Sequence, residues 1–413
     1  MSKLDELIQE LCPVGVEFKP FGESATILRG ASPRPIKNFI TTDVDGVNWI
    51  KIGDVGVGSK YVTQAKEKIT RQGAQKSRSV KKGDFILSNS MSFGRPYILK
   101  IDGCIHDGWL AISDFSNVYN SDFLYHLLNS TTVQHEMAKK ASFGGAVQNL
   151  NADIVKSLVL PVPPLEVQHE IVRILDNFTE LTAELTAELA ARKKQYEYYR
   201  NSLLLQNDNI SMFPLKTVVK RSSSGGTPTK GNSTYYDNGN IPWLRTQDVR
   251  FNEIQEIDSF ITEKAVEKTA AKWIPSNCVI VAISGATAGR CAINKIPTTT
   301  NQHCLNLQIN ESKALYKYIF YCVCSQYEEL LSKKQGARGD LNSSLVLNIA
   351  IPIPYPEDSV KSLTEQERIV EILDRFDALC NDLTTGLPAE IAARQKQYEY
   401  YRDKLLTFEE LKR

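Results

Sequence analysis

The sequence has no hydrophobic stretch long enough to cross a membrane. No apolar run in its 413 residues approaches the roughly 18 to 20 residues that a spanning helix needs. The first ten residues, MSKLDELIQE, hold three acidic residues and no apolar core, so a secretory signal is not expected. At roughly 150 residues per domain, the length allows two or three domains with buried cores. These observations predict a cytoplasmic protein.

Patterns that mark metal sites and catalytic centres are also missing. The eight cysteines are scattered without the paired spacing of a zinc site, and Cys322 and Cys324 lie in the apolar run YIFYCVCS, where buried, reduced thiols are expected. The glycines of 53–58 have the wrong spacing for a dinucleotide loop, and 222–231 lacks the Gly-Lys-Ser/Thr of a phosphate loop. Hydrolase, metalloprotease, helicase and amino-methyltransferase signatures are absent. No metal site and no catalytic residue are predicted.

Neither sign of charge dominates the whole chain. Lys and Arg number 49 against 48 Asp and Glu, so the net charge of +1 does not by itself indicate an anionic partner. The distribution is uneven, because 51–100 holds eleven basic and three acidic residues, whereas 166–188 holds six acidic residues and one arginine. A basic binding surface balanced by acidic helices, or simply solvated faces of opposite sign, would give this pattern.

The chain contains an internal repeat of two helical segments. IVRILDNF (171–178) returns as IVEILDRF (369–376), and AARKKQYEYYR (190–200) returns as AARQKQYEYYR (392–402). The offsets of the two matches are 198 and 202 residues, so the second copy holds four extra residues. We place them around Thr385–Pro388, where Gly and Pro favour the end of one helix and the start of another.

Apolar residues spaced four and three apart form a heptad seam in both copies. In the first copy the seam positions are Ile171, Leu175, Phe178, Thr182, Leu185, Leu189, Arg192, Tyr196, Tyr199 and Leu203. In the second copy they are Ile369, Leu373, Phe376, Ile391, Arg394, Tyr398, Tyr401 and Leu405. We predict a long helix over Gln168–Leu205 and a second helical segment that packs against it as an antiparallel coiled coil. The alternative is that each segment packs separately on its own domain.

The segments before the two helices form a more diverged repeat. WIKIGDV (49–55) matches WLRTQDV (243–249), Gly94-Arg95 matches Gly289-Arg290, and FLYHLLNS (123–130) matches YIFYCVCS (318–325). Each half alternates short β-branched runs with turn residues, followed by one helix and a Pro-rich exit. The predicted fold class is therefore α+β, with two mixed α/β domains and two long helices in a pseudo-twofold repeat. The predicted ranges are 1–162 and 208–358 for the domains, and 163–207 and 359–413 for the helices.

Two diverged globules, each followed by a nearly invariant helix, resemble the specificity subunit of a type I restriction–modification system. The resemblance rests on LPVPPLEVQ (160–168), on the two QYEYYR segments and on ELCPVGVEF (10–18), and it covers essentially the whole chain. It implies two target recognition domains that each read one half of a split, asymmetric DNA sequence. The helices would set the spacer and dock two methylation and two restriction subunits. S-adenosylmethionine, ATP and Mg²⁺ would belong to those partners, so the chain itself would be non-catalytic and cofactor-free.

The resemblance assigns candidate roles to charged and polar residues, since cations position a protein on DNA phosphates and polar side chains read base edges. Phosphate-contact candidates are Arg29, Arg34, Lys37, Lys76, Arg78, Lys81 and Lys82 in the first globule, and Lys216, Lys220, Arg221 and Lys230 in the second. Base-edge candidates are Ser90, Ser92, Arg95, Gln148 and Asn149, and Ser284, Thr287, Arg290, Arg338 and Asp340. A role in capping turns is the alternative for each of these residues. The glycines beside them are expected to form turns.

Tyr198 and Tyr400 face away from the seam and are candidates for partner contact, because tyrosine offers apolar area with a polar tip. His106 and His303, which fall at related places shifted by two residues, are expected to cap turns or to contact DNA. Two other functions compete with DNA recognition. One is a coiled-coil scaffold that tethers two partner subunits without binding DNA, and the other is a stand-alone methyltransferase or nuclease.

Overall fold

The computed structural model describes residues 2–56, 58–89, 93–142, 149–205, 209–334, 340–382 and 384–411. The chain divides into two compact units. Unit 1 consists of Met1–Leu185 with Ile391–Arg413, and unit 2 consists of Thr186–Glu390. Each unit therefore combines one globule with parts of both helical segments. The four ranges expected from the sequence stay a prediction, because the compact units combine them differently.

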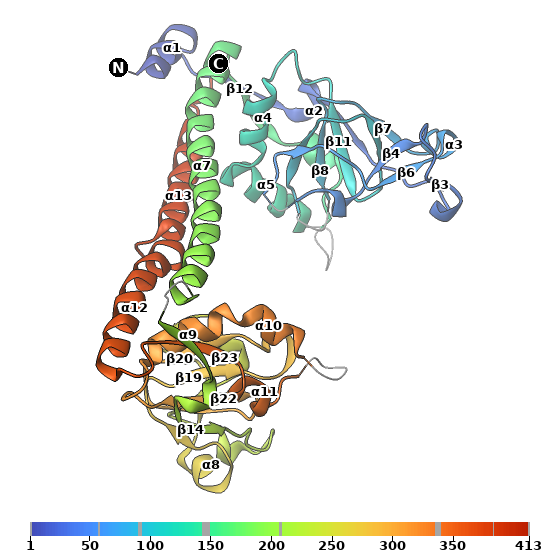
Figure 1. Ribbon diagram of the computed structural model, residues 1–413. Coiled ribbons are helices and arrows are strands. Elements are labelled where there is room, and N and C mark those ends of the chain that lie inside the picture. The colour runs from blue at the N-terminus through green and yellow to red at the C-terminus, as the bar shows by residue number, and fades with distance from the viewer. Residues whose placement is uncertain are drawn as a thin grey trace. The chain divides into compact units, whose positions relative to one another are not determined.

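The first globule, which precedes the long helix, contains two five-stranded sheets and a two-stranded ribbon (Figure 1). The strand orders are β3-β6-β4-β10-β7, β2-β11-β8-β9-β5 and β1-β12, and only β4/β10 and β5/β9 pair in parallel. The strands are β1 Glu17–Pro20, β2 Thr26–Arg29, β3 Ile40–Thr41, β4 Val47–Ile50, β5 Tyr61–Val62, β6 Glu67–Ile69, β7 Arg78–Val80, β8 Phe85–Ser88, β9 Pro96–Leu99, β10 Gly103–Ile105, β11 Trp109–Ser113 and β12 Val159–Val162.

The sheet that contains β8 is buried on both faces. Along β8, Phe85 and Leu87 pack in a core with helix α4 (Ser121–Leu128), whereas Ile86 packs in a second core with Ile50 and Ile105 of the other sheet. Strands covered on both sides read as continuous apolar runs, which explains the segments FILS and PYIL. The remaining helices of this globule are α1 Lys3–Leu11, α2 Phe21–Ser24, α3 Arg71–Ala74, α5 Thr131–Ser142 and α6 Ala152–Lys156, with short 3₁₀ turns at Ile36–Asn38 and Ile52–Asp54.

The second globule, between the long helix and the second helical segment, repeats this topology. Its strand orders are β17-β15-β21-β18, β14-β22-β19-β20-β16 and β13-β23, which match the first globule strand for strand except that β3 has no counterpart among the described residues. The strands are β13 Ile210–Pro214, β14 Val219–Ser224, β15 Ile241–Leu244, β16 Glu253–Ile254, β17 Phe260–Ile261, β18 Trp273–Ile274, β19 Val279–Ala282, β20 Cys291–Asn294, β21 Thr298–Thr300, β22 Cys304–Ile309 and β23 Ala350–Pro354. The helices are α8 Glu263–Lys268, α9 Tyr316–Ser325, α10 Tyr327–Ser332 and α11 Ser343–Leu347, with 3₁₀ turns at Leu215–Thr217, Ser233–Tyr235, Thr246–Asp248 and Gly285–Thr287.

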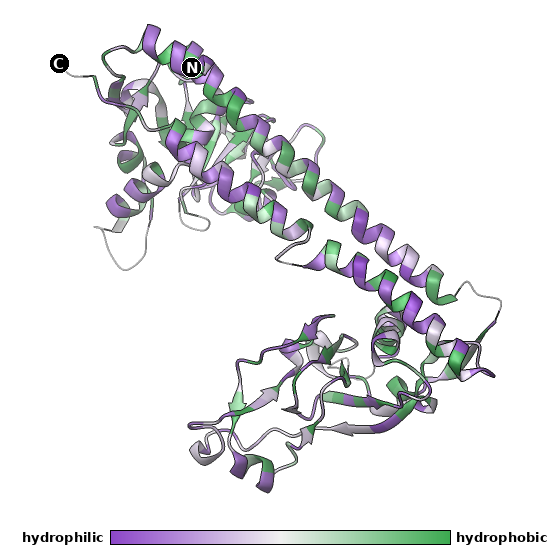
Figure 2. Cartoon of the chain, turned by 90° about the vertical axis from the view of Figure 1, so that its left-hand side faces the viewer, coloured by the Kyte–Doolittle hydropathy of each residue, from purple (hydrophilic) through white to green (hydrophobic). Residues whose placement is uncertain are grey.

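The long helix α7 runs without a break from Leu165 to Leu205, which is 41 residues (Figure 1). The second segment is broken into α12 (Ser359–Asn381) and α13 (Leu387–Leu405), at the place expected from the four extra residues. Hydrophobic and hydrophilic residues alternate along these helices in Figure 2, as a seam requires. The predicted fold class and repeat are confirmed.

Aromatic stacking across the seam pairs the helices in each unit. In unit 1, Phe178 of α7 stacks on Tyr401 of α13 at a centroid distance of 5.3 Å. In unit 2, Tyr199 of α7 stacks on Phe376 of α12 at 5.6 Å. The same two residue types thus meet in both units with the roles of the two copies exchanged. The antiparallel pairing expected from the seam is observed.

A repeated aspartate connects each globule to its helix. In unit 1, Lys60 lies 2.6 Å from Asp122 of α4 and 3.9 Å from Asp176 of α7. In unit 2, Lys317 of α9 lies 2.8 Å from Asp374 of α12 and 3.0 Å from the strand residue Glu253. Beside Asp176, the buried His126 shares a hydrogen bond of 2.8 Å with the hydroxyl of Tyr398 in α13.

The C-terminal part of the chain also pairs with the N-terminal part inside unit 1. The amide of Val16 donates to the Glu409 carbonyl at 2.8 Å, and the Leu411 amide donates to the Val16 carbonyl at 2.9 Å. Gly15 has a φ of +103°, and a Cβ there would lie 2.8 Å from the Glu409 carbonyl oxygen. Only glycine fits this close approach without strain.

Three local expectations differ from the structure. Each globule has several helices rather than one, because the additional helices are short or carry few apolar positions; α5, for example, buries Val133, Met137 and Ala141 along an otherwise polar sequence. The Pro-rich exits at 160–164 and 351–355 begin as strands, β12 and β23, whose prolines are tolerated because each lies in a two-stranded ribbon. Helix α7 begins at Leu165, directly after Pro163-Pro164, and not at Gln168. The expected burial of Cys322 and Cys324 is confirmed.

Candidate nucleic-acid interface

Four segments of the first globule that are far apart in sequence meet at the ends of its strands. They are 29–34 at and after the end of β2, the described ends 88–89 and 93–95 of the connection between β8 and β9, 106–108 between β10 and β11, and 149–150. The Ala31 amide donates to the Ile105 carbonyl at 3.2 Å, the Asn89 amide to the Gly108 carbonyl at 3.1 Å, and the Leu150 amide to the Asn89 carbonyl at 2.9 Å. We call these segments the first loop cluster.

Asp107 lies at the centre of the first loop cluster. Its carboxylate accepts a hydrogen bond of 2.7 Å from the Ser32 hydroxyl and lies 3.4 Å from the guanidinium of Arg34. The Ser32 hydrogen bond is the main reason that the pKa of Asp107 is below its ordinary value, with a smaller contribution from Arg34. The Asp107 carbonyl also accepts a hydrogen bond from Arg29 Nε at 3.4 Å and one from the side-chain Nδ2 of Asn89 at 2.8 Å.

Three predicted phosphate-contact residues thus come together at this cluster, two from its own segments and Arg78 from strand β7. Arg29 and Arg34 both contact Asp107, and Arg78 Nε donates to the Arg29 carbonyl at 3.2 Å. Arg78 follows Arg29 by 49 residues in the sequence, but the two come together because β2 and β7 are edge strands of the two stacked sheets. The guanidiniums of Arg29 and Arg34 stay at the surface, where an anionic ligand could reach them.

The second globule forms an equivalent cluster from 225–228, 282–290, 301–303 and 340–341. The Gly226 amide donates to the Thr300 carbonyl at 2.9 Å, the Ile283 amide to the His303 carbonyl at 2.9 Å, and the Leu341 amide to the Ile283 carbonyl at 2.8 Å. We call these segments the second loop cluster.

Two predicted base-edge residues meet in the second loop cluster. The Ser284 hydroxyl donates to Asp340 Oδ1 at 2.6 Å, and the Gly285 amide lies 3.3 Å from the same oxygen. The Thr227 hydroxyl donates to Gln302 Oε1, and Gln302 Nε2 lies 3.2 Å from His303 Nε2.

The Gly-Arg pairs close both β-hairpins as turns. Gly94 has a φ of +69° and its amide donates to the Ser88 carbonyl, while Gly289 has a φ of +93° and its amide donates to the Ala282 carbonyl. The interpretation of these glycines as turn formers is correct. The neighbouring Arg95 is exposed and lines a cavity of about 520 Å³ with Lys60, His126 and other residues of unit 1, whereas Arg290 is half-buried.

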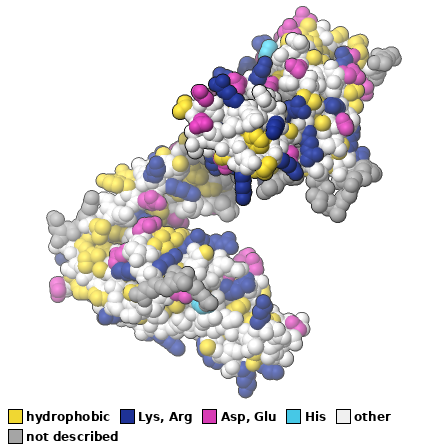
Figure 3. Space-filling model, turned by 90° about the vertical axis from the view of Figure 1, so that its right-hand side faces the viewer, with side chains coloured by type: hydrophobic (Ala, Val, Ile, Leu, Met, Phe, Trp, Pro, Cys, Tyr) yellow, Lys and Arg dark blue, Asp and Glu magenta, His cyan; other side chains and the backbone are white. Residues whose placement is uncertain are grey.

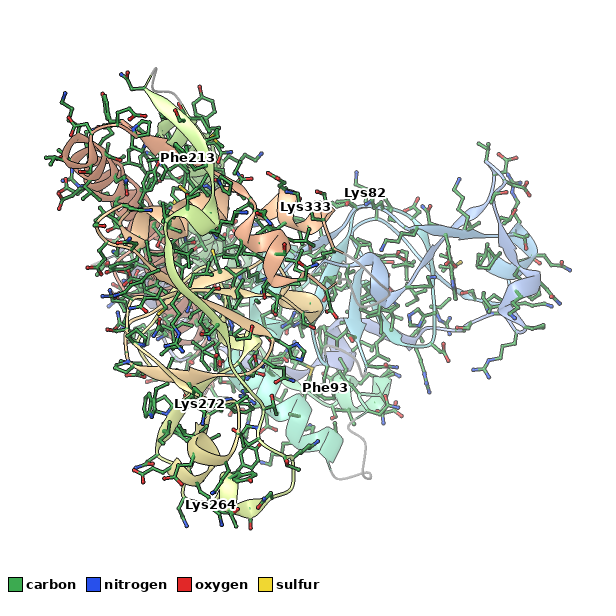
Figure 4. All side chains as sticks on the ribbon, turned by 60° about the horizontal axis from the view of Figure 1, so that its bottom comes forward. Lys82, Phe93, Phe213, Lys264, Lys272 and Lys333 are labelled. Atoms are coloured by element: carbon green, nitrogen blue, oxygen red, sulfur yellow. The ribbon has the colours of Figure 1, made fainter. Side chains whose placement is uncertain are left out.

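The other predicted cations lie elsewhere on the globules. Lys82 is in the turn at the opposite end of β7 from Arg78, and its amide donates to Asp102 at 2.7 Å (Figure 4). Lys76 lies over the ring of Phe39, 4.9 Å from its centroid. Exposed side chains without a place in either cluster are those of Lys37, Lys81, Lys216, Lys220, Arg221 and Lys230. In Figure 3, Lys and Arg side chains are spread over the visible face with acidic side chains between them.

The remaining base-edge candidates lie outside the described residues or have only local contacts. Ser90, Ser92, Gln148 and Arg338 lie outside the described residues. Asn149 is exposed beside Leu150, and Thr287 accepts the Arg290 amide through its carbonyl. The Gly108 amide donates to His106 Nδ1 at 2.7 Å, a contact that fits the turn-capping interpretation, and burial lowers the pKa of His106.

On the helices, the exposed fraction is 65% for Tyr198 and 63% for Tyr400, while Tyr398 on the seam is buried. Within the described residues, no helix is long and apolar enough to cross a membrane. Across the same described ranges, no three His, Cys, Asp or Glu side chains are placed to hold a metal ion.

Sequence reasoning missed Ser32, Asp107, Thr227 and Gln302. The signal was present, because Gly30-Ala31-Ser32-Pro33 matches Gly225-Gly226-Thr227-Pro228 at an offset of 195 residues. The same offset places Asp107 on Gln302. Aligning His106 with His303 instead, two residues out of this register, concealed the match.

Comparison with known proteins identifies the two repeats. A family model described as "Type I restriction modification DNA specificity domain" matches residues 13–192 and again residues 207–393. The fold is therefore that of a protein with two DNA specificity domains in tandem. The chain belongs to the specificity subunits of type I restriction–modification systems.

Individual relatives support this assignment. The chain is 37% identical over 297 residues to the "Type I restriction enzyme EcoR124I/EcoR124II specificity subunit" of Escherichia coli, covering 69% of this chain and 70% of the relative. It is 31% identical over 416 residues to a putative specificity subunit of Haemophilus influenzae, covering 95% and 96%. A solved chain from work on complex assembly and conformational transition of the type I R-M system has a TM-score of 0.67 at 18% identity, with 95% and 97% coverage, which shows the shared fold.

Proposed function

We propose that this chain is the non-catalytic DNA-recognition subunit of a type I restriction–modification complex, in which each globule reads one half of a bipartite, asymmetric DNA site. The observation that supports this most directly is the pair of loop clusters. They occupy the same place on the same scaffold, but they carry different side chains. A repeated scaffold with different reading surfaces suits two different half-sites.

The helices have a second role in this proposal. Their near-identical sequences would offer the same docking surface twice, with Tyr198 and Tyr400 exposed for contact with methylation and restriction subunits. Two methylation subunits and two restriction subunits would carry S-adenosylmethionine, ATP and Mg²⁺, so this chain would bind none of them. The complex would act in the cytoplasm on double-stranded DNA, and the helix length would set the unread spacer between the half-sites.

Exchange of one globule tests whether each globule recognises its half-site independently of the other. Residues 213–356 would be replaced by the second globule of a relative with a different site, and the methylated adenines of a host carrying the complete system would be sequenced. We expect one half of the methylated motif to change and the other half to stay. If both halves change, or neither does, the globules are not independent readers.

A DNA-binding measurement separates this function from the scaffold alternative. The assembled complex would be titrated with DNA at several salt concentrations, because phosphate contacts make the affinity fall with salt. A scaffold that only tethers partners would leave the partners' affinity and salt dependence unchanged when this chain is added.

A further inference from the structure

Asp107 and Gln302 occupy equivalent positions in the two globules. Each is the middle residue of a three-residue connection, 106–108 between β10 and β11 and 301–303 between β21 and β22. In both globules this side chain accepts a hydrogen bond from the matched hydroxyl, Ser32 or Thr227, and both pairs are separated by 75 residues in the sequence. The hydroxyl contact holds the side chain in one orientation at the tip of the connection.

The surroundings of the two positions differ in charge. Two arginines of the first loop cluster, Arg29 and Arg34, contact Asp107, and Arg78 of the neighbouring strand β7 donates to the Arg29 carbonyl. At the same offset of 195 residues the second globule has Ser224 in place of Arg29 and Thr229 in place of Arg34.

The third arginine is replaced by a lysine that is already engaged. Lys272, labelled in Figure 4, corresponds to Arg78, and its ammonium donates to the Val266 carbonyl in α8. Two of the three cationic positions at the first loop cluster are therefore uncharged in the second, and the third keeps a cation that donates to a carbonyl of α8.

Each position offers a different set of hydrogen-bonding groups. Asp107 is a carboxylate, since its pKa is lowered chiefly by the Ser32 hydrogen bond, and its second oxygen faces Arg34. The Asp107 carboxylate can therefore orient the guanidinium of Arg34, but it donates no hydrogen bond itself. Gln302 is exposed and presents an amide oxygen and an amide NH₂ together, with the oxygen oriented by Thr227.

We propose that these two positions determine part of the DNA specificity: the first loop cluster reads a guanine through Arg34, oriented by Asp107, and the second reads an adenine through Gln302. This assignment rests on the proposed function. Guanine presents two acceptors in the major groove, which match the two parallel donors of arginine. Adenine presents an acceptor beside a donor, which matches the amide of glutamine. Asp107 is a positioning residue that acts through Arg34.

Two substitutions at Gln302 test the adenine assignment in the complete complex. Gln302→Ala removes both amide groups, and Gln302→Glu keeps the acceptor for Thr227 but loses the donor for adenine N7. The control is Gln255→Glu, an exposed amide beside β16, at the opposite sheet edge from β14. We expect discrimination at one adenine of one half-site to fall roughly 5- to 150-fold in both Gln302 variants, with the control unchanged.

Asp107→Asn tests the positioning role in the first globule. Asparagine keeps an oxygen for the Ser32 hydroxyl but removes the charge that faces Arg34. We expect the methylated motif to become degenerate at one guanine of the other half-site, with the melting temperature unchanged. A loss of melting temperature without any change of motif would mean that Asp107 only stabilises the loops, and would overturn its assignment.

The readouts separate failure of this assignment from failure of the proposed function. Sequencing of methylated DNA from hosts with the unaltered chain first establishes a motif. If no motif depends on this chain, the proposed function fails. If a motif exists but keeps the same bases and the same affinity ratio in Gln302→Ala, the proposed function stands and the assignment of Gln302 is wrong.

Discussion

Lengthening α7 tests whether the helices measure the distance between half-sites. In α7 no side chain between Leu175 and Leu204 is fully buried, and the seam at Thr182 is polar, so four helix-forming residues inserted after Glu184 disturb little packing. Four residues lengthen a continuous helix by about 6 Å, close to two base pairs at about 3.4 Å each. They also rotate the following seam by about 40°, which a coiled coil can absorb as a stutter.

We expect the unread spacer in the methylated motif to grow by one or two base pairs, while both half-sites keep their sequences. The matched control is an insertion of four flexible residues between Thr385 and Gly386, in the connection that already separates α12 from α13. A loop there takes up the added chain, so the spacer should not change. Methylome sequencing of both variants gives the answer. An unchanged spacer with intact methylation in the α7 variant would show that the helices are docking surfaces and not a ruler.

Two further predictions concern single side chains. Replacing Arg95 or Arg290 by Ala should weaken specific DNA binding by on the order of 1–3 kcal/mol if the arginine reads a base; a lower melting temperature with unchanged affinity of the folded complex would identify a turn cap instead. Burial lowers the pKa of His126 despite the nearby Asp176, so the unfolded chain binds a proton more readily near its ordinary pKa of about 6.5. Unfolding free energy should therefore be fully retained above about pH 6.5 and fall as the pH drops towards the lowered value, and a His126→Gln variant, followed by denaturant titration, should show a smaller fall; an equal fall in both proteins would contradict this.

The helices were predictable because their signal is local and repeated. Seam positions such as Phe178 and Phe376 recur at fixed spacing over many turns, and the stacking partners Tyr401 and Tyr199 lie on the same pattern. The break near Gly386 followed from a count of residues between matched motifs. Such patterns can be recognised in the sequence without knowledge of tertiary contacts.

The loop clusters could not be derived in the same way. Many strands have only two to four residues, and their order depends on pairing between distant segments. The sequence therefore indicated that strands are present but not their order in the sheets. The contact of Ser32 with Asp107 joins residues 75 positions apart and depends on the stacking of two sheets. Exposed lysines such as Lys37 and Lys81 carry the same sequence signal as the clustered arginines, and only the fold separates them.

The way unit 1 closes has a consequence for synthesis on the ribosome. Tyr398 of α13 and Leu406, which directly follows α13, belong to the same core as Leu175 of α7, and the pairing of Val16 needs Glu409. Unit 1 is therefore complete only after synthesis of residues that follow Leu185 by more than two hundred positions, which at 5–20 residues per second takes about 10–40 s. During that interval its apolar helix face lacks its native cover. A nascent chain that stops before Ile391 lacks this cover, so early termination leaves exposed an apolar surface that is buried in the folded unit.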